Sequence, residues 1–121
     1  MPDDACNSAA SGETYDAVVI GAGPSGSLAA LLLARAGHRV LQVERQRFPR
    51  AKVCGCCLNQ RAQQLLDRAG LLQGLRSLRA CPTDRLSLHS SGRRLSISMP
   101  GGLAISRRAM DQWLAETAAA A

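Results

Sequence analysis

The chain has 121 residues and therefore room for one small domain. Its hydrophobic content of 46% excludes wholesale disorder, and the scarcity of aromatic residues means that aliphatic side chains must build the core. The net charge of +6 is concentrated where Arg45, Arg47, Arg50 and Lys52 follow one another closely. No series of aromatic base-stacking platforms accompanies these charges, so we expect a compact anion such as a pyrophosphate as their partner, and no nucleic acid. A solvated basic surface is the alternative.

Cysteine use and the N-terminus indicate a reducing compartment. The chain has five cysteines, which are Cys6, Cys54, Cys56, Cys57 and Cys81. Their number is odd, and the acidic Asp3 and Asp4 stand where a signal peptide would carry positive charge. We therefore expect a cytoplasmic protein with reduced thiols. The apolar run 28–34 is far too short to span a bilayer, which predicts no transmembrane segment and leaves peripheral membrane contact open.

The first half of the domain is predicted to be a strand, a glycine turn, a helix and a second strand. Residues 1–14 are small and polar and indicate a disordered leader, so the domain is expected to cover 15–121. The apolar run 15–20 predicts a strand buried on both faces. A helix is expected over 24–36, with proline near its first turn and glycine just past its end, and a short strand over 39–43.

The second half is predicted to be a loop, a helix, a β-meander and a last helix. Asn59 can cap the first of these helices. Alternating apolar residues at 86–88 and 95–99, separated by a turn that contains glycine, predict a hairpin, and the apolar pair at 103–105 predicts a third strand of the same meander. Ser106 is expected to cap the final helix.

The final helix raises the question of whether the domain is complete. Crossover helices return the chain to the sheet, so a third parallel strand is expected after the helix that Ser106 begins. No residues remain to form it, and 118–121 are expected to stop in mid-helix. The predicted fold class is α/β, a βαβ unit followed by a β-meander and a helix, incomplete at the C-terminus.

A G-x-G-x-x-G motif marks the turn between the first strand and the first helix. It is formed by Gly21, Gly23 and Gly26 around Pro24 and Ser25. The motif alone is weak, but here it follows a buried strand directly and opens a helix, which is the context of a Rossmann-type dinucleotide site. The first glycine would allow the tight turn, the second would admit a pyrophosphate to the backbone, and the third would let helix and strand pack closely. The helix N-terminus would present its N–H groups to the phosphates.

Glu44 ends the second strand, eighteen residues beyond Gly26. Its carboxylate is expected to accept hydrogen bonds from an adenosine ribose. The same charge would repel a 2′-phosphate, which disfavours NADP at this site. The motif does not separate FAD from NAD, because both share the ADP half that such a fold binds.

The cysteine-rich loop admits more than one interpretation. Cys54, Cys56 and Cys57 lie within four residues and cannot comfortably surround one zinc ion, and the two histidines lie elsewhere in the chain. We therefore expect no metal site. A tight turn with buried or idle cysteines is the leading interpretation, and a redox or active-site thiol, with Cys54 as the candidate, is the alternative.

The stretch 44–59 reads Glu-Arg-Gln-Arg-Phe-Pro-Arg-Ala-Lys-Val-Cys-Gly-Cys-Cys-Leu-Asn. It resembles a flavoprotein superfamily that holds geranylgeranyl reductases, flavin-dependent halogenases and hydroxylases of the p-hydroxybenzoate hydroxylase type. In that group an acidic residue and an arginine end the second strand, and a Phe-Pro-Arg leads into a Lys-x-Cys-Gly turn. The match at 52–55 is nearest to the reductase-like branch. The segment 105–111 is similar to the family's later pattern apolar-x-Arg-x-x-apolar-Asp, with Arg107 at the arginine.

This resemblance implies a Rossmann-type FAD-binding domain, with the ADP end of FAD at the glycine turn. It further implies that Glu44 holds the ribose, and that Arg45 and Arg107 lie along the adenosine and pyrophosphate. Arg50 is a further candidate for contact with the cofactor phosphate or adenine, with a plain surface role as the alternative.

The loop through Cys54 and Gly55 would pass near the isoalloxazine ring, where substrate is handled. The family's later Gly-Asp motif and its substrate-binding sheet are absent from these 121 residues. We therefore expect the FAD-binding portion of a flavin-dependent oxidoreductase, most like a geranylgeranyl reductase-type enzyme, with NAD(P)H as electron donor and a small isoprenoid or aromatic substrate. The alternatives are a flavin-dependent monooxygenase or halogenase, a non-catalytic truncated nucleotide-binding fragment, and an NAD-binding dehydrogenase domain.

Overall fold

A computed structural model describes residues 12–54 and 57–121. In chain order, the helices and strands are β1 (Ala17–Ile20), α1 (Pro24–Arg35), β2 (Val40–Val43), β3 (Cys57–Leu58), α2 (Gln60–Arg68), α3 (Leu72–Ser77), β4 (Cys81–Ser90), β5 (Arg93–Ala104) and α4 (Arg107–Ala119). They form the expected α/β fold. No helix in the described ranges is both long and apolar enough to cross a membrane. Most of the predicted leader, residues 1–11, lies outside the described residues.

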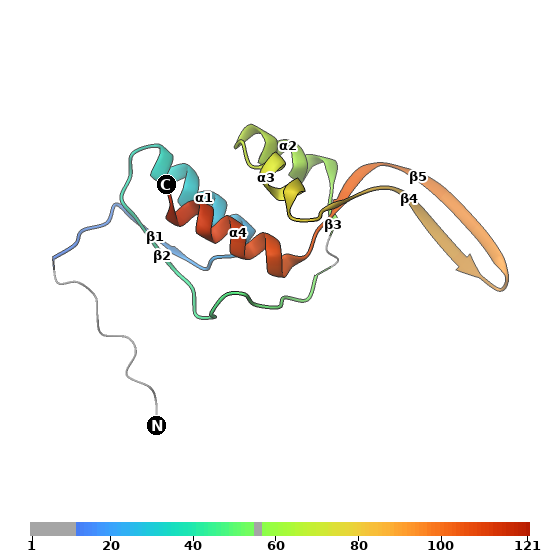
Figure 1. The fold of residues 1–121 in the computed structure, drawn as a ribbon, viewed down its shortest axis with the longest axis horizontal. Coiled ribbons are helices and arrows are strands. Elements are labelled where there is room, and N and C mark those ends of the chain that lie inside the picture. Colours follow the sequence, from blue (N-terminus) through green and yellow to red (C-terminus); the bar gives the residue numbers. More distant parts are fainter. Residues whose placement is uncertain (1–11, 55–56) are drawn as a thin grey trace, which may run out of the picture.

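The predicted βαβ unit is present. Strands β1 and β2 pair in parallel, with Ala17 opposite Val40. Helix α1 connects them, with Pro24 in its first turn. Gly37, just past the end of α1, has a φ of +89°, a conformation that glycine adopts without strain and that ends the helix cleanly. In Figure 1, α4 lies alongside α1, although the two helices are far apart in sequence.

The parallel pair is covered on one face only, which corrects the expectation of a strand buried on both faces. Val19 packs against the core on the side of α1. Val18 and Ile20 point to the opposite face and are 58% and 88% exposed. The apolar character of both faces follows the pattern of a parallel strand, but the described residues supply a covering helix on one side alone.

The antiparallel sheet has the strand order β3-β5-β4 and corrects the predicted meander. The residues expected to form a separate third strand at 103–105 instead belong largely to the end of β5, and β3 is the third strand. Strand β5 runs through Pro100 and Gly101, where the pairing with β4 shifts register between Thr83 and Arg85. Gly101 has a φ of +92°. Proline and glycine therefore form a bulge within one long strand rather than a turn between two.

Beyond this bulge, the β4–β5 hairpin projects away from the helices (Figure 1). Leu86 lies opposite Ile97, and Leu88 lies opposite Leu95, and such cross-strand partners share one face of a sheet. Together with Met99, these side chains are 42–56% exposed. The hairpin therefore has one apolar and one polar face, and its turn at 91–92 falls inside the predicted turn.

The hydrophobic core lies between the helices and is built from aliphatic residues, as the composition predicts. Its fully buried leucines come from α1, from α3 with the residue before it, and from α4: Leu31, Leu71, Leu75 and Leu114. Met110 is also buried, and Trp113 is partly buried at the edge of the core, so both lie on the face of α4 that packs against the core.

The helix caps follow the sequence only in part. The Oδ1 atom of Asn59 accepts a hydrogen bond from the N–H of Ala62 at 2.8 Å, so Asn59 caps α2 as predicted. Ser106 occupies the N-cap position of α4, but its side chain makes no capping hydrogen bond. The six-residue helix α3 was not predicted, because a helix this short carries too little periodic signal.

Gly74 provides a test of the packing between α3 and α4. A β-carbon at this position would overlap the indole ring of Trp113. We expect Gly74→Ala to destabilise the fold by about 1–3 kcal/mol, despite the higher helix propensity of alanine. Urea unfolding should show a clearly smaller loss when the same change is made in a Trp113→Leu background. Equal losses in the two backgrounds would contradict this packing.

Candidate functional site

The turn between β1 and α1 brings the three glycines of the motif together. Gly21 has a φ of +104°, which residues with side chains rarely adopt. A β-carbon on Gly26 would overlap the carbonyl oxygen of Gly21, so α1 can begin this close to β1 only because that side chain is missing. A β-carbon on Gly23 would have room, since its nearest neighbour would be Nη2 of Arg50 at 3.9 Å. Gly23 is the N-cap of α1 and supplies no side-chain cap, which leaves the first N–H groups of the helix available.

Glu44 joins the end of β2 to this turn. Its Oε2 atom accepts a hydrogen bond from the N–H of Ala22 at 2.9 Å, and its Oε1 atom accepts one from the N–H of Gln46 at 3.0 Å. The hydrogen bond from Ala22, followed by that from Gln46, holds the pKa of Glu44 below its usual value, and the charge of Arg50 adds to this effect. The acid therefore stands at the turn, as the motif predicts, and remains ionised.

Gln42 also supports the turn, although sequence reasoning did not identify it. Its Nε2 atom donates to the carbonyl of Gly21 at 3.1 Å and lies 3.3 Å from the hydroxyl of the buried Ser27. A single polar residue in the otherwise apolar β2 was the signal that could have revealed it. Gln42 therefore supplies a side-chain hydrogen bond to the Gly21 carbonyl within the turn.

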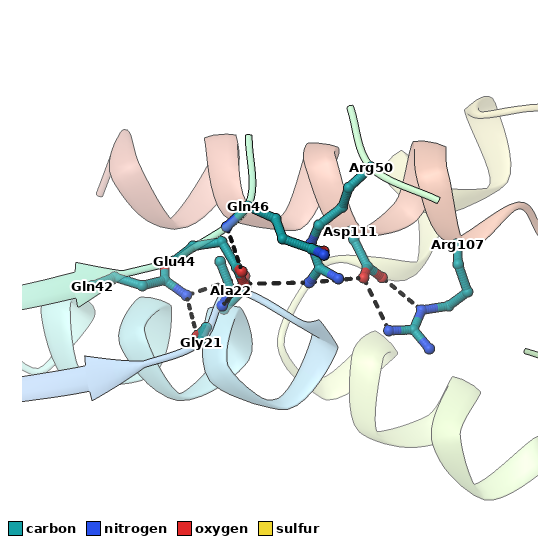
Figure 2. Close-up of polar contacts among 9 residues, drawn as sticks. Gly21, Ala22, Gln42, Glu44, Gln46, Arg50, Arg107 and Asp111 are labelled. Atoms are coloured by element: carbon teal, nitrogen blue, oxygen red, sulfur yellow. Dashed lines mark hydrogen bonds and ion pairs between the residues drawn. The ribbon is translucent and has the colours of Figure 1, made fainter. Parts of the chain in front are cut away.

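Figure 2 shows a chain of ion pairs that runs from Glu44 to Arg107. The Nη2 atom of Arg50 lies 3.5 Å from Oε2 of Glu44 and 3.3 Å from Oδ2 of Asp111. Arg107 donates to both carboxylate oxygens of Asp111, from Nε at 2.7 Å and from Nη2 at 2.9 Å. Asp111 is fully buried and raises the pKa of Arg107 well above its usual value. In the sequence, Asp111 is the last residue of the family pattern at 105–111, and no site role was predicted for it.

The arginine candidates differ in burial. Arg50 is buried, Arg107 is half-buried, and Arg45 is exposed. All three line one surface hollow together with the glycine turn and Glu44. The structure therefore brings the predicted arginines to the predicted turn, where Arg50 is buried between two carboxylates.

The remaining candidate residues lie near this hollow or outside the described ranges. Pro24 and Ser25 form the first turn of α1. The thiol of Cys54 contacts the guanidinium of Arg107 and contributes to its raised pKa, after the larger effect of Asp111. Gly55 and Cys56 lie outside the described residues. Within the ranges 12–54 and 57–121, no group of three or more His, Cys, Asp and Glu side chains could hold a metal ion.

The donor set of this hollow suits a pyrophosphate linked to a ribose. The α1 N-terminus offers backbone N–H groups and the positive end of the helix dipole. Arg50 adds a buried guanidinium whose Nε atom has no hydrogen-bond partner among the described residues. Glu44 offers carboxylate oxygens with lone pairs beyond those that its two backbone donors use. The residues present therefore fit the ADP half of a dinucleotide.

A glycine turn between parallel strands, with an acid at the end of the second, defines a Rossmann-type dinucleotide-binding fold. The chain belongs to the FAD binding domain family, whose model matches residues 14–114. This match confirms the expected superfamily of FAD-dependent oxidoreductases and the expectation of FAD as the family's cofactor.

Individual relatives include a reductase and two oxidising enzymes. The chain is 50% identical over 60 residues to a menaquinone reductase of Mycolicibacterium smegmatis, a match that covers 50% of this chain and 15% of the relative. It is 33% identical over 86 residues to a squalene monooxygenase of Eremothecium gossypii, across 71% of this chain and 17% of the relative. A solved flavin-dependent brominase superposes with a TM-score of 0.72 and 26% identity, over 88% of this chain and 27% of its own. The matched region is thus a minor part of each relative.

The two glycines of the turn that are not at positive φ should respond differently to alanine. Gly26→Ala places a β-carbon against the Gly21 carbonyl and should lower the free energy of unfolding by about 1–3 kcal/mol. Gly23→Ala, the matched control, has room and should change it by no more than about 0.5 kcal/mol. Chemical denaturation of both variants measures this. Equal stability of the two would show that α1 does not depend on the close approach.

Glu44 should make the stability of the fold depend on acid pH. Its pKa is lowered in the folded state, mainly by the N–H of Ala22, so its stabilising contribution is complete above the ordinary value of about 4.3 and is lost as the pH falls through the lowered pKa. The melting temperature of the wild-type chain should fall below about pH 4.3, and Glu44→Gln should make that fall smaller. Glu116→Gln, which changes a surface acid that accepts from Gln112, is the control and should leave that fall unchanged.

Proposed function

We propose that this chain binds FAD through its ADP half and serves as the FAD-binding part of a flavin-dependent oxidoreductase. The observation that supports this most strongly is the convergence of the glycine turn and Glu44 with the two arginines, Arg50 and Arg107, around one hollow. Cations and helix N–H groups attract a diphosphate, and a carboxylate accepts from ribose hydroxyls. Membership of the FAD binding domain family identifies the cofactor as FAD.

Each part of the ADP half has candidate partners. The pyrophosphate would lie against the backbone of Gly23 and the first turn of α1, formed by Pro24 and Ser25, with Arg50 and Arg107 as the cationic partners. The ribose would bind Glu44, and the exposed Arg45 would face the adenosine. By the family resemblance, the loop through Cys54 and Gly55 would lie nearer the isoalloxazine ring.

Bound flavin would carry electrons between a nicotinamide donor and an organic substrate. We therefore propose NAD(P)H as the electron donor and a small isoprenoid or aromatic molecule as the substrate. Support for an organic substrate comes from the relatives, whose names assign them menaquinone and squalene.

Two types of oxidoreductase fit the relatives equally well. A reductase, of the geranylgeranyl reductase type that the Lys-x-Cys-Gly turn resembles, is supported by the higher identity of 50% to the menaquinone reductase. A monooxygenase or halogenase is supported by the longer match of 86 residues to the squalene monooxygenase and by the superposition on the brominase. A non-catalytic nucleotide-binding role would use the same ADP site but would include neither reduction nor oxygenation or halogenation of a substrate.

The ADP site can be tested on the chain by NMR titration with ADP and with FAD. We expect the two ligands to bind with similar affinity, because the described residues of the hollow address the half that they share. Gly23→Val, which puts a branched side chain where the pyrophosphate meets the backbone, should abolish binding of both. Glu44→Gln should weaken both at least about tenfold through the loss of charged hydrogen bonds. Arg93→Gln, in the hairpin, is the control.

The outcomes separate the proposal from its alternatives. Wild-type affinity in both site variants, with an intact fold by circular dichroism, would place the nucleotide elsewhere. Normal binding by Glu44→Gln and none by Gly23→Val would retain the pyrophosphate site and remove the ribose assignment.

A further inference from the structure

We infer that Asp111 is a positioning residue of the ADP site, because its carboxylate holds the guanidinium of Arg50 over the glycine turn. This inference rests on the function proposed above and adds to it a residue from α4, far from the motif in sequence. Its support comes from the burial of Asp111 and from the pattern of ion pairs around Arg50.

Asp111 is the most buried charged residue of the described chain, with 0% exposure. A buried carboxylate needs charged or hydrogen-bonding partners, and Asp111 has two guanidiniums. Arg107 stands one helical turn earlier on α4 and grips both carboxylate oxygens, at 2.7 and 2.9 Å. Such a two-point contact fixes the orientation of a carboxylate. Arg107, on the same helix, therefore fixes the Asp111 carboxylate in an orientation that faces Arg50.

Arg50 comes from the loop after β2 and reaches Asp111 with Nη2 at 3.3 Å. Its guanidinium also lies 5.2 Å from the centre of the Phe48 ring, and its Nη2 atom lies 3.9 Å from the place where a β-carbon of Gly23 would stand. The Nε atom is buried and has no partner among the described residues. Arg50 is thus a buried cation close to the glycine turn, and its Nε donor is unused among the described residues.

Asp111 could act on an anionic ligand by its charge or by its position, and the two effects have opposite signs. Two carboxylates, Glu44 and Asp111, and two guanidiniums, Arg50 and Arg107, sum to no formal charge. By charge alone, removal of Asp111 would leave a positive cluster and tighten the binding of ADP. By position, removal would leave Arg50 with Glu44 as its carboxylate partner, and the guanidinium would close on that carboxylate and direct its donors to it instead of to a diphosphate.

The effect of Asp111 on ADP binding through the position of Arg50 should outweigh its effect through charge, because Arg50 is almost fully buried, with 8% of its side chain exposed. A buried guanidinium needs a charged or hydrogen-bonding partner, so the loss of Asp111 favours a closer contact between Arg50 and Glu44. The distances of 3.5 Å to Glu44 and 3.3 Å to Asp111 are both longer than a typical hydrogen bond, so the guanidinium is shared between the two acids and has room to approach Glu44. The diphosphate would then lose a preorganised cation.

The test is Asp111→Asn, with ADP affinity measured by NMR titration of the full chain well below the melting temperature. We expect ADP to bind at least about tenfold more weakly, which corresponds to the loss of one charged hydrogen-bonding partner. In an Arg50→Gln background, which already lacks the guanidinium, the same change at Asp111 should cause little further loss. A merely structural role would weaken binding equally in both backgrounds, and that result would overturn the inference.

Unchanged or tighter ADP binding by Asp111→Asn would also overturn it, and tighter binding would show that Asp111 acts by charge. If Asp111→Asn does not fold, Asp111→Glu takes its place, because it keeps the charge and displaces the carboxylate by one methylene. Weakened ADP binding by Asp111→Glu, dependent on Arg50, supports positioning, and unchanged binding contradicts it. Failure of the wild-type chain to bind ADP would refute the proposed function itself and is seen before any variant is made.

Discussion

The closeness of α1 to the end of β1 is the constraint on which the rest of the site depends. Because Gly26 has no side chain, its backbone approaches the carbonyl of Gly21, and the helix starts where the strand stops. That same carbonyl accepts from Gln42 on the neighbouring strand, and the next N–H, of Ala22, donates to Glu44. A wider turn would lengthen both contacts, so the positions of the helix N-terminus and of the acid depend on one steric condition.

Two carboxylates, one at the end of β2 and one on α4, hold different parts of the site in place. Glu44 is partly exposed and ties β2 to the turn by hydrogen bonds to backbone. Asp111 is fully buried on α4 and reaches the same region through Arg50. The packing of α4 beside α1 does more than form the core, since it brings Asp111 and Arg107 to a hollow whose glycine turn, acid and other arginines come from the first half of the chain. The βαβ unit and α4 thus line one hollow together.

Sequence reasoning succeeded where the signal is local. The glycine motif, the strand–helix–strand order and the cap at Asn59 each depend on neighbours in the chain, and the structure contains all of them. It was wrong about the strand at 103–105, because proline and glycine indicate a turn and a bulge equally well, and only pairing with β4 and β3 decides between them. Gln42 and Asp111 were missed because their partners are long-range. A polar residue in an apolar strand and an aspartate in an Arg-x-x-x-Asp spacing have meaning only once the sheet and α4 are placed.

The two faces of the β4–β5 hairpin make its sequence sensitive to the parity of insertions and deletions. Leu86 and Leu88 alternate with polar residues, so a deletion of one residue between the bulge and the turn would carry the apolar side chains of β4 to the face opposite those of β5. A deletion of two residues would shorten the strand and keep every leucine on its side. The length of this hairpin should therefore vary among related sequences in steps of two residues, because successive residues of a strand alternate between its two faces. A loop has no such alternation.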